Sequence, residues 1–240
     1  MAYSAIINLM SIIKIQYNLE KDLENYDYNY LSEKFPSYGR DDSDYAPRMW
    51  PTVKQKVNDA DESDKLPIIR EYLIDNFEVK KIVDSTIKSI LEYWETIEAA
   101  YFNKLCKFMD VSHNVKDMDV YITTMLKCPY NSFENYFYIS FFSCLSIQVE
   151  TIMHESMHLV FRQSYDKYIT ERGVDSQGLL EINEAMTVLL NFEFREFLVA
   201  PAWNNKPSIK DLKEEMVIIC KAHKPFKEML DRLIDMRAVA

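Results

Sequence analysis

The sequence predicts an α+β protein that is mostly α-helical. Glycine occurs only 3 times in 240 residues, whereas tyrosine occurs 16 times and phenylalanine 13 times, and this composition favours helices and short aromatic strands over a turn-rich β fold. Hydrophobic residues make up 48% of the chain, which is enough for a substantial core. Apolar residues recur at helical spacing along most of the sequence, and strand-like runs lie between residues 119 and 142.

Residues 1–78 are the first of three expected parts, an acidic and mainly helical region packed on the rest of the chain. The apolar start MAYSAIINLMSIIKIQYNL is expected to be an amphipathic element, and a segment with helical spacing follows it. Three prolines, a glycine and several aspartates predict a loop over residues 36–51. Pro67 suits the first turn of a helix through IIREYLIDNF. Residues 20–78 contain 15 acidic and 8 basic side chains, a net charge of −7.

Residues 79–165 are the second part. From Val79 to Met109 the apolar side chains follow a 3.6-residue period, which predicts the longest helix of the protein. The runs DVYITTML and NYFYISFF are β-branched and aromatic, and KCPYNSFE between them contains turn residues, so we expect two strands of a small sheet. Helical spacing returns from Ser146 through Tyr165.

Residues 166–240 are the third part, a C-terminal helical subdomain. A loop with two glycines, DKYITERGVDSQG, separates it from the preceding helix. Three further helices are expected, and their signals are apolar spacing over residues 179–197, a capping pattern at Ser208 and Asp211, and Pro225.

Charge and composition exclude several classes of partner. The formal charge is −10 and the chain has no Lys/Arg-rich run, whereas a nucleic-acid partner requires a basic face. No uncharged run approaches the ~20 residues of a membrane span, and the apolar start lacks the basic stretch of a signal peptide. The cysteines form no C-x-x-C pair and are expected to be buried free thiols; they are Cys106, Cys128, Cys144 and Cys220. These features favour a cytoplasmic protein without a membrane or nucleic-acid partner.

The stretch VETIMHESMHLVF contains a metal-binding pattern. His154 and His158 are four residues apart, so on a helix both imidazoles lie on one face and can bind one ion. Glu155 lies roughly 100° around the helix, where it can hold a metal-bound water instead. Two histidine ligands and a carboxylate base at this spacing are typical of zinc hydrolases. Histidines that are merely hydrogen-bonded inside a helical core are the alternative.

A catalytic zinc ion needs a third protein ligand and an open position for water. The stretch LLEINEAMTVLLNFEF carries Glu181 and Glu184 near the start of the next expected helix. An acidic residue at a helix start can simply stabilise the helix dipole, and this alternative applies to Glu181. Glu184 has apolar neighbours, and a buried carboxylate needs a partner such as a metal ion. The residues therefore favour Glu184 as the third ligand and leave Glu181 open.

In order and character, residues 79–197 resemble the gluzincin metallopeptidases, the thermolysin-like branch of the zincins. In that family a long helix and a small sheet precede the H-E-x-x-H helix, and a glutamate on a following helix completes the site. The matching pieces of this chain are the helix at 79–109, the strands within 119–142, the motif HESMH and Glu184 in NEAMT.

The resemblance implies a zincin-like fold with a small mixed sheet and a bound Zn²⁺ ion as cofactor. It implies that His154, His158 and Glu184 hold the ion, and that the chain hydrolyses bonds of a peptide or protein substrate with Glu155 as general base. It further implies that the strand at 135–142 lies at a sheet edge, where an extended peptide can pair with it.

The sequence departs from the family at two functional positions. Many relatives have an aspartate four residues after the third ligand, which orients a histidine, but position 188 is Val. The candidates to take its place are a backbone carbonyl, Glu181, Asn183 and Thr187. Relatives stabilise the transition state with a tyrosine or a histidine beyond the glutamate helix; no tyrosine follows Tyr168, so His223 is the candidate for this catalytic role. A plain surface histidine is the alternative.

Other functions stay open at this point. One is a catalytically impaired zincin-like protein, in which a structural zinc ion joins two helices and the acidic N-terminal part binds a partner. A di-iron carboxylate bundle requires two E-x-x-H pairs, and only Glu155 and His158 have that spacing. The stretch SFENYFYI resembles the aminopeptidase branch of the family, in which a glutamate binds the free amine of the substrate. Glu134 and Asn135 match that branch, and a solvated Glu134 is the alternative.

Overall fold

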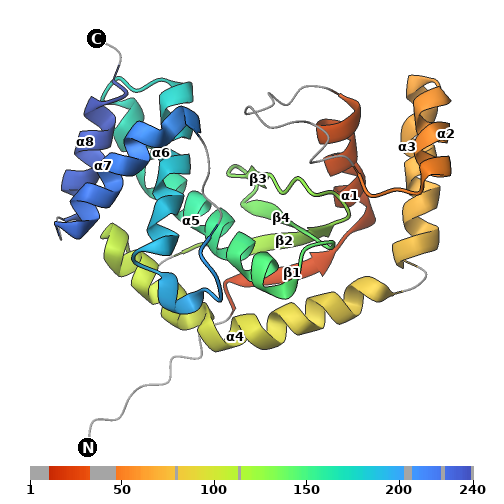
Figure 1. Ribbon diagram of the computed structural model, residues 1–240, viewed down its shortest axis with the longest axis horizontal. Helices are drawn as coiled ribbons and strands as arrows, with labels where there is room; N and C mark the ends of the chain where they lie inside the picture. The colour runs from red at the N-terminus through yellow and green to blue at the C-terminus, as the bar shows by residue number, and fades with distance from the viewer. Residues whose placement is uncertain are drawn as a thin grey trace, which may run out of the picture. The chain divides into compact units, whose positions relative to one another are not determined.

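The structure, a computed structural model, describes residues 11–32, 47–78, 81–112, 115–202, 207–222 and 225–238. It is α+β and mostly helical, with a small mixed sheet, as predicted (Figure 1). The first ten residues of the amphipathic start and residues 36–46 of the expected loop lie outside the described residues. Within the described ranges, no helix combines the length and the hydropathy of a membrane span.

The regular elements follow one another along the chain. In order they are β1 (Ile13–Tyr17), α1 (Leu19–Tyr26), the π-helical turn η1 (Asp27–Leu31), α2 (Pro51–Asp59), α3 (Glu62–Leu73), the π-helical turn η3 (Ile74–Glu78), α4 (Ile82–Met109), β2 (Met118–Thr123), β3 (Tyr130–Asn131), β4 (Tyr136–Ser140), α5 (Leu145–Thr170), α6 (Ser176–Met186), the 3-10 turns η4 (Thr187–Asn191), η5 (Arg195–Phe197) and η6 (Pro207–Ile209), α7 (Lys210–Lys221) and α8 (Phe226–Asp235).

The chain forms two compact units. Unit 1 consists of Met1–Ile13, Trp94–Met118 and Met153–Ala240, and unit 2 of Lys14–Tyr93 and Asp119–Ile152. Helices α4 and α5 contribute residues to both units. The expected three parts follow chain order, whereas each unit combines segments that are far apart in the sequence.

The sheet has the strand order β1-β2-β4-β3. Strands β2 and β4 are parallel, from the pair Asp119 and Tyr136 to the pair Thr123 and Ser140, and β3 pairs antiparallel with β4. The expected edge position of the 135–142 strand is therefore wrong, because β4 has a neighbour on both sides. A tight turn brings β3 back onto β4: the Asn131 side chain accepts hydrogen bonds from the backbone N–H groups of Phe133 and Glu134, both at 3.0 Å.

A buried polar cluster joins α1 to the end of β2 in unit 2. Asp22 is fully buried. Its Oδ1 accepts hydrogen bonds from the Thr123 hydroxyl at 2.7 Å and the Thr124 backbone N–H at 3.0 Å, and its Oδ2 accepts one from the Thr124 hydroxyl at 2.9 Å. Asn25 donates to Thr123 Oγ1 at 2.8 Å and to the Lys127 carbonyl at 3.1 Å. These bonds compensate for removing the polar groups from water.

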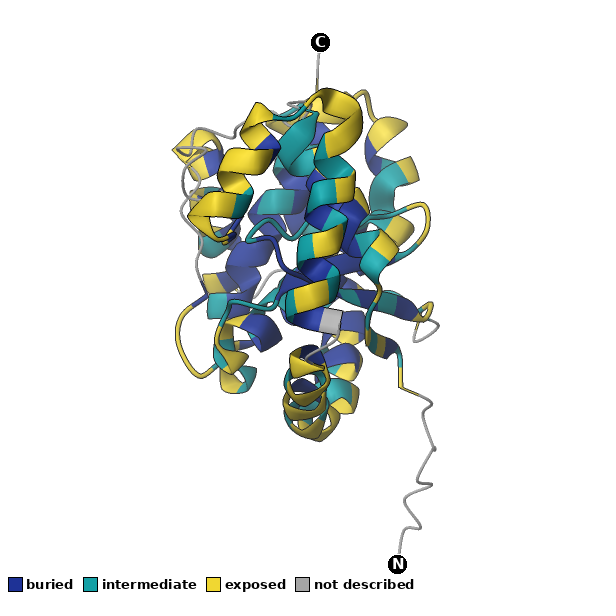
Figure 2. Cartoon of the chain, turned by 90° about the vertical axis from the view of Figure 1, so that its right-hand side faces the viewer, coloured by how far each residue is buried: buried dark blue, intermediate teal, exposed yellow. Residues whose placement is uncertain are grey.

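Unit 1 has an aromatic core. The fully buried ring of Tyr101 on α4 contacts four other rings edge to face, and these belong to Trp94, Phe102, Phe194 and Phe197. Helices α6, α7 and α8 pack together in the same unit (Figure 1). In Figure 2 the helices carry stripes of buried and exposed residues, as amphipathic helices do.

Several predicted helices are present but differ in extent. Helix α4 confirms the long helix; it begins at Ile82, after a turn at Lys81, and residues 79–80 of the expected helix lie outside the described residues. Helix α3 begins at Glu62, so Pro67 lies inside the helix and not in its first turn. The acidic residues Glu62 and Asp64 stabilise the earlier start through the helix dipole.

The C-terminal helices also differ from the prediction. The helix expected over 179–197 ends at Met186 and continues as 3-10 turns, where the Asn191 side chain bonds to the backbone of Ala202. No side-chain hydrogen bond caps the start of α7, so the expected cap at Ser208 is absent, whereas α8 follows Pro225 as predicted.

All four cysteines are free thiols, as expected. Cys106 and Cys220 are buried, but Cys128 is half-buried and Cys144 is exposed. The prediction of burial is thus wrong for Cys144, because this residue directly precedes α5 at its N-terminal end.

Candidate metal centre

Helix α5 carries both candidate histidine ligands. The helix is 26 residues long, and its apolar residues around the histidines are buried; these are Ile152, Met153, Met157, Leu159, Val160 and Phe161. Because His154 and His158 lie one turn apart, their imidazoles project from the same side. The Nε2 atoms of the two rings are 3.0 Å apart. His158 is buried and His154 is half-buried.

Helix α6 carries the candidate carboxylate ligand. The helix begins after Asp175, whose side chain accepts a hydrogen bond from the Gly178 backbone N–H at 2.7 Å. Its buried apolar residues are Leu179, Ile182, Ala185 and Met186. Glu184 Oε1 lies 3.7 Å from Nε2 of His158, and 24% of the Glu184 side chain is exposed. The helix therefore presents a carboxylate to the buried histidine.

His154, His158 and Glu184 form a group that could hold a metal ion, with one ligand atom of each within 4.8 Å of the others. Two nitrogens that bind one zinc ion at about 2.0–2.1 Å in a tetrahedral arrangement lie roughly 3.3 Å apart. The observed separation of the two Nε2 atoms, 3.0 Å, is close to this value. The residues thus fit a zinc ion, and imidazole and carboxylate groups also suit other divalent first-row metals.

Glu181, the other acidic residue near the start of α6, has different partners. Its Oε2 accepts a hydrogen bond from Arg237 Nε at 2.6 Å, and its Oε1 accepts one from Gln177 Nε2 at 2.9 Å. Both carboxylate oxygens are therefore engaged by neighbouring side chains. The structure brings Glu184, and not Glu181, to the two histidines.

Of the two residues predicted to act in catalysis, Glu155 is among the described residues and His223 is not. Glu155 follows His154 on α5 and is 9% exposed, so its carboxylate belongs to the same helix turn as the candidate ligands. His223 lies outside the described residues. Its role as transition-state stabiliser stays a prediction.

The candidates for orienting a histidine lie close to Glu184 in the sequence and differ in their surroundings. Val188, four residues after Glu184, is buried and apolar. The Thr187 hydroxyl donates a hydrogen bond to the Glu184 carbonyl at 2.8 Å, and Glu181 is paired with Arg237. Asn183, next to Glu184, is fully buried, and its role in orienting a histidine stays a prediction, like those of Glu181, Thr187 and a backbone carbonyl.

Tyr101 supports the histidine helix, a contact that the sequence analysis did not predict. Its hydroxyl donates a hydrogen bond to the carbonyl of Met153 at 2.6 Å. The Ser156 hydroxyl lies 3.4 Å from the Tyr101 hydroxyl and 3.2 Å from the same carbonyl. Burial raises the pKa of Tyr101, so its hydroxyl keeps its proton and stays a donor. Tyr101 and Met153 are 52 residues apart, and no local pattern indicates such a pair.

Glu134, the candidate amine-binding residue of the sequence analysis, lies in the turn between β3 and β4. Its side chain is 64% exposed and its Oε2 is 3.4 Å from Nζ of Lys21. These surroundings are those of a solvated carboxylate with a weak surface ion pair.

Comparison of the chain with protein families, curated proteins and solved structures finds no match in any of the three. The structure itself defines an α+β protein whose unit 1 contains a candidate metal centre of two histidines and one glutamate.

Proposed function

We propose that the chain is a zinc-dependent peptidase. The observation that carries the proposal is the convergence of His154, His158 and Glu184, with Glu155 adjacent to the first ligand. Two histidines and one glutamate are a ligand set of catalytic zinc sites, which keep one position for water. The resemblance of residues 79–197 to gluzincins supports peptide bonds as the substrate class.

Each residue of the site has a defined task in this reaction. His154, His158 and Glu184 hold the ion, and both histidines must be neutral to do so. When bound, zinc would lower the pKa of a coordinated water and polarise the substrate carbonyl. Glu155 accepts the proton of that water and later delivers it to the leaving amine. His223 donates a hydrogen bond to the carbonyl oxygen as it becomes negative.

Replacing Glu155 with glutamine tests this function, because an amide of the same shape cannot accept the proton. We expect Glu155→Gln to lower peptide hydrolysis by a factor of at least ~10², while about one zinc ion per chain stays bound. Cleavage of a mixed peptide library is followed by mass spectrometry, and bound zinc is measured by elemental analysis. Glu171→Gln, in the turn directly after α5, is the matched control and should leave both quantities unchanged. Hydrolysis that survives Glu155→Gln contradicts the mechanism.

A second candidate function is a zincin-like protein with a structural metal ion and no hydrolytic activity. Val188 favours this alternative, because it cannot form the hydrogen bond by which the family's aspartate orients a histidine. A wild-type chain that binds zinc but cleaves no member of a broad peptide library would identify this second function.

A further inference from the structure

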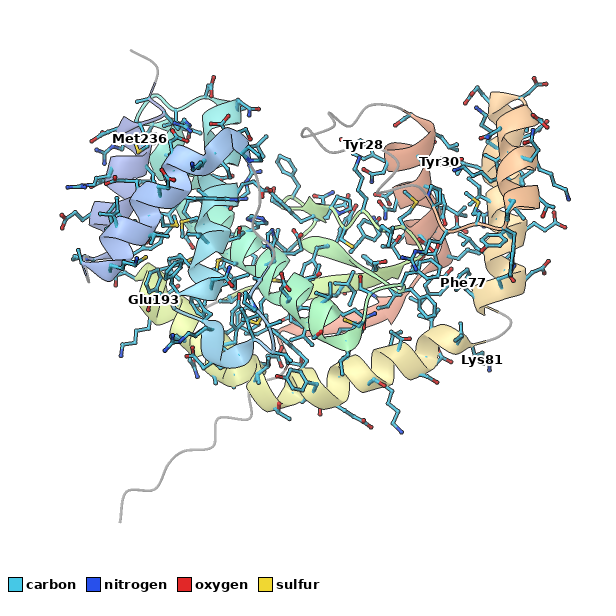
Figure 3. All side chains as sticks on the ribbon, viewed as in Figure 1. Tyr28, Tyr30, Phe77, Lys81, Glu193 and Met236 are labelled. Carbon is cyan, nitrogen blue, oxygen red and sulfur yellow. The ribbon has the colours of Figure 1, made fainter. Side chains whose placement is uncertain are left out.

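The segment that follows α8 packs against the start of α6. Ala238 forms an antiparallel bridge with Val174, just before α6. A methyl group added to Gly178 would lie 2.7 Å from Val174 Cγ1 and 3.3 Å from Arg237 Cβ, so the glycine permits this close approach. The end of α8 can be followed at Met236 in Figure 3. The first turn of α6 is therefore in contact with the residues around Arg237.

Arg237 joins α6 to α7 through three hydrogen bonds. Its Nε donates to Glu181 Oε2 at 2.6 Å, and its two terminal nitrogens donate to the two carboxylate oxygens of Asp211, both at 2.9 Å. Only 18% of the Arg237 side chain is exposed. The hydrogen bonds from Arg237 hold the pKa of Asp211 below its usual range. A planar guanidinium in such a two-pronged contact fixes geometry better than a single charge does.

We infer that Arg237 is a positioning residue for the metal ligand Glu184. Glu181 precedes Glu184 by three residues, so the two lie on neighbouring faces of one helical turn, and fixing the first restricts the second. The inference rests on the proposed metal centre. It adds Arg237, which follows Glu181 by 56 residues in the sequence, to the residues that act on that centre.

The shape of α6 explains why the helix needs this contact. The α-helix has only 11 residues, and it changes to a 3-10 turn at Thr187, three residues after the ligand. Isolated helices of this length are marginally stable in water. The Asp175 cap and the Arg237 contact both act on the N-terminal part of α6. Of these two, only the Arg237 contact, made through Glu181, involves the helical turn that contains Glu184.

The test is the affinity of the metal-free full chain for zinc, measured by competition with a chromophoric chelator. Partners outside the ligand shell typically contribute 10–100-fold to metal affinity. Arg237 does not contact the candidate ligand Glu184 itself but acts through Glu181. We therefore expect the lower end of this range, so Arg237→Ala should weaken zinc binding roughly tenfold. Arg237→Lys keeps the charge but loses the two-pronged contact. The zinc affinity of Arg237→Lys should therefore lie between those of the wild type and Arg237→Ala. Arg232→Ala removes another arginine–carboxylate ion pair, with Glu215 at 2.6 Å, and should leave zinc affinity unchanged.

A double-mutant cycle separates positioning from general destabilisation. If Arg237 acts through Glu184, Arg237→Ala should have no further effect on zinc affinity in a Glu184→Ala background. An equal loss in both backgrounds, or unchanged affinity in Arg237→Ala, would overturn the inference while leaving the metal centre intact. A wild-type chain that takes up no zinc would overturn the metal centre and this role together. If Arg237→Ala does not fold by circular dichroism, Arg237→Lys carries the same comparison.

Discussion

Glu181 and Glu184 are three residues apart on α6, yet their carboxylates contact different partners. Glu184 lies against His158, and Glu181 bonds to Arg237. We predict that Glu184→Gln weakens zinc binding by more than ~100-fold, because it alters a candidate ligand, whereas Glu181→Gln weakens it by the ~10–100-fold typical of a partner outside the ligand shell. Chelator competition measures both. The reverse order of the two effects would identify Glu181 as the third ligand.

The candidate ligands could be predicted from the sequence because the signal is local. His154 and His158 belong to one helix turn, and Glu184 is an acidic residue among apolar neighbours. The contact of Arg237 could not be predicted, because its partner Glu181 is 56 residues away. The residues next to Arg237 in the sequence do not distinguish an arginine in such a contact from an exposed one. The hydrogen bond of Tyr101 to the Met153 carbonyl could not be predicted either, because these two residues are also far apart in the sequence.

At the scale of elements, Tyr101 stabilises α5 from α4. We predict that Tyr101→Phe lowers the free energy of unfolding by about 1–2 kcal/mol, because the fully buried carbonyl contact is lost while the ring stays in the aromatic core. Tyr165→Phe is the matched control: its hydroxyl bonds to the Met109 carbonyl, but its side chain is only half-buried, so water can replace the bond and the loss should be smaller. Denaturant unfolding of the metal-free variants measures both. Equal stability of Tyr101→Phe and the wild type would contradict this anchoring role.

Helix periodicity predicted the long elements well and the short ones less well. Helices α4 and α5 have many apolar positions in register, so their existence follows from the sequence. The end of α6 at Met186 depends on contacts such as that of Asn191 with Ala202, which lie in tertiary structure. The position of β4 inside the sheet likewise depends on the turn that returns β3 to it.

At the scale of the whole molecule, Asp22 makes stability depend on pH. Burial raises the pKa of Asp22 to about 6, although hydrogen bonds from Thr123, Thr124 and Tyr17 oppose the rise. An aspartate in the unfolded chain has a pKa of about 3.9, so the folded state binds this proton more tightly. The stabilising effect of the proton is fully present below about pH 4 and is lost as the pH rises through about 6. The shift of about 2 units corresponds to about 3 kcal/mol.

Asp22→Asn should remove this dependence. The amide oxygen can keep the hydrogen bonds from the Thr123 hydroxyl and the Thr124 N–H, and the amide nitrogen can donate to the Thr124 hydroxyl. We predict that the free energy of unfolding of the wild type falls relative to that of Asp22→Asn by up to about 3 kcal/mol between pH 4 and pH 7. Denaturant titrations of the metal-free proteins across this range give the difference directly. A difference that does not change with pH would contradict the raised pKa.

The segments that make up the two units are synthesised at different times. Every segment of unit 2 precedes residue 153, whereas the three candidate ligands, at positions 154, 158 and 184, come after it. Since a chain leaves the ribosome from its N-terminus and domains generally fold as units, all of unit 2 has emerged before the first ligand. If the chain binds a metal ion as proposed, loading of that ion would therefore be a late step in its maturation, which the nascent chain reaches only after Glu184 has been synthesised.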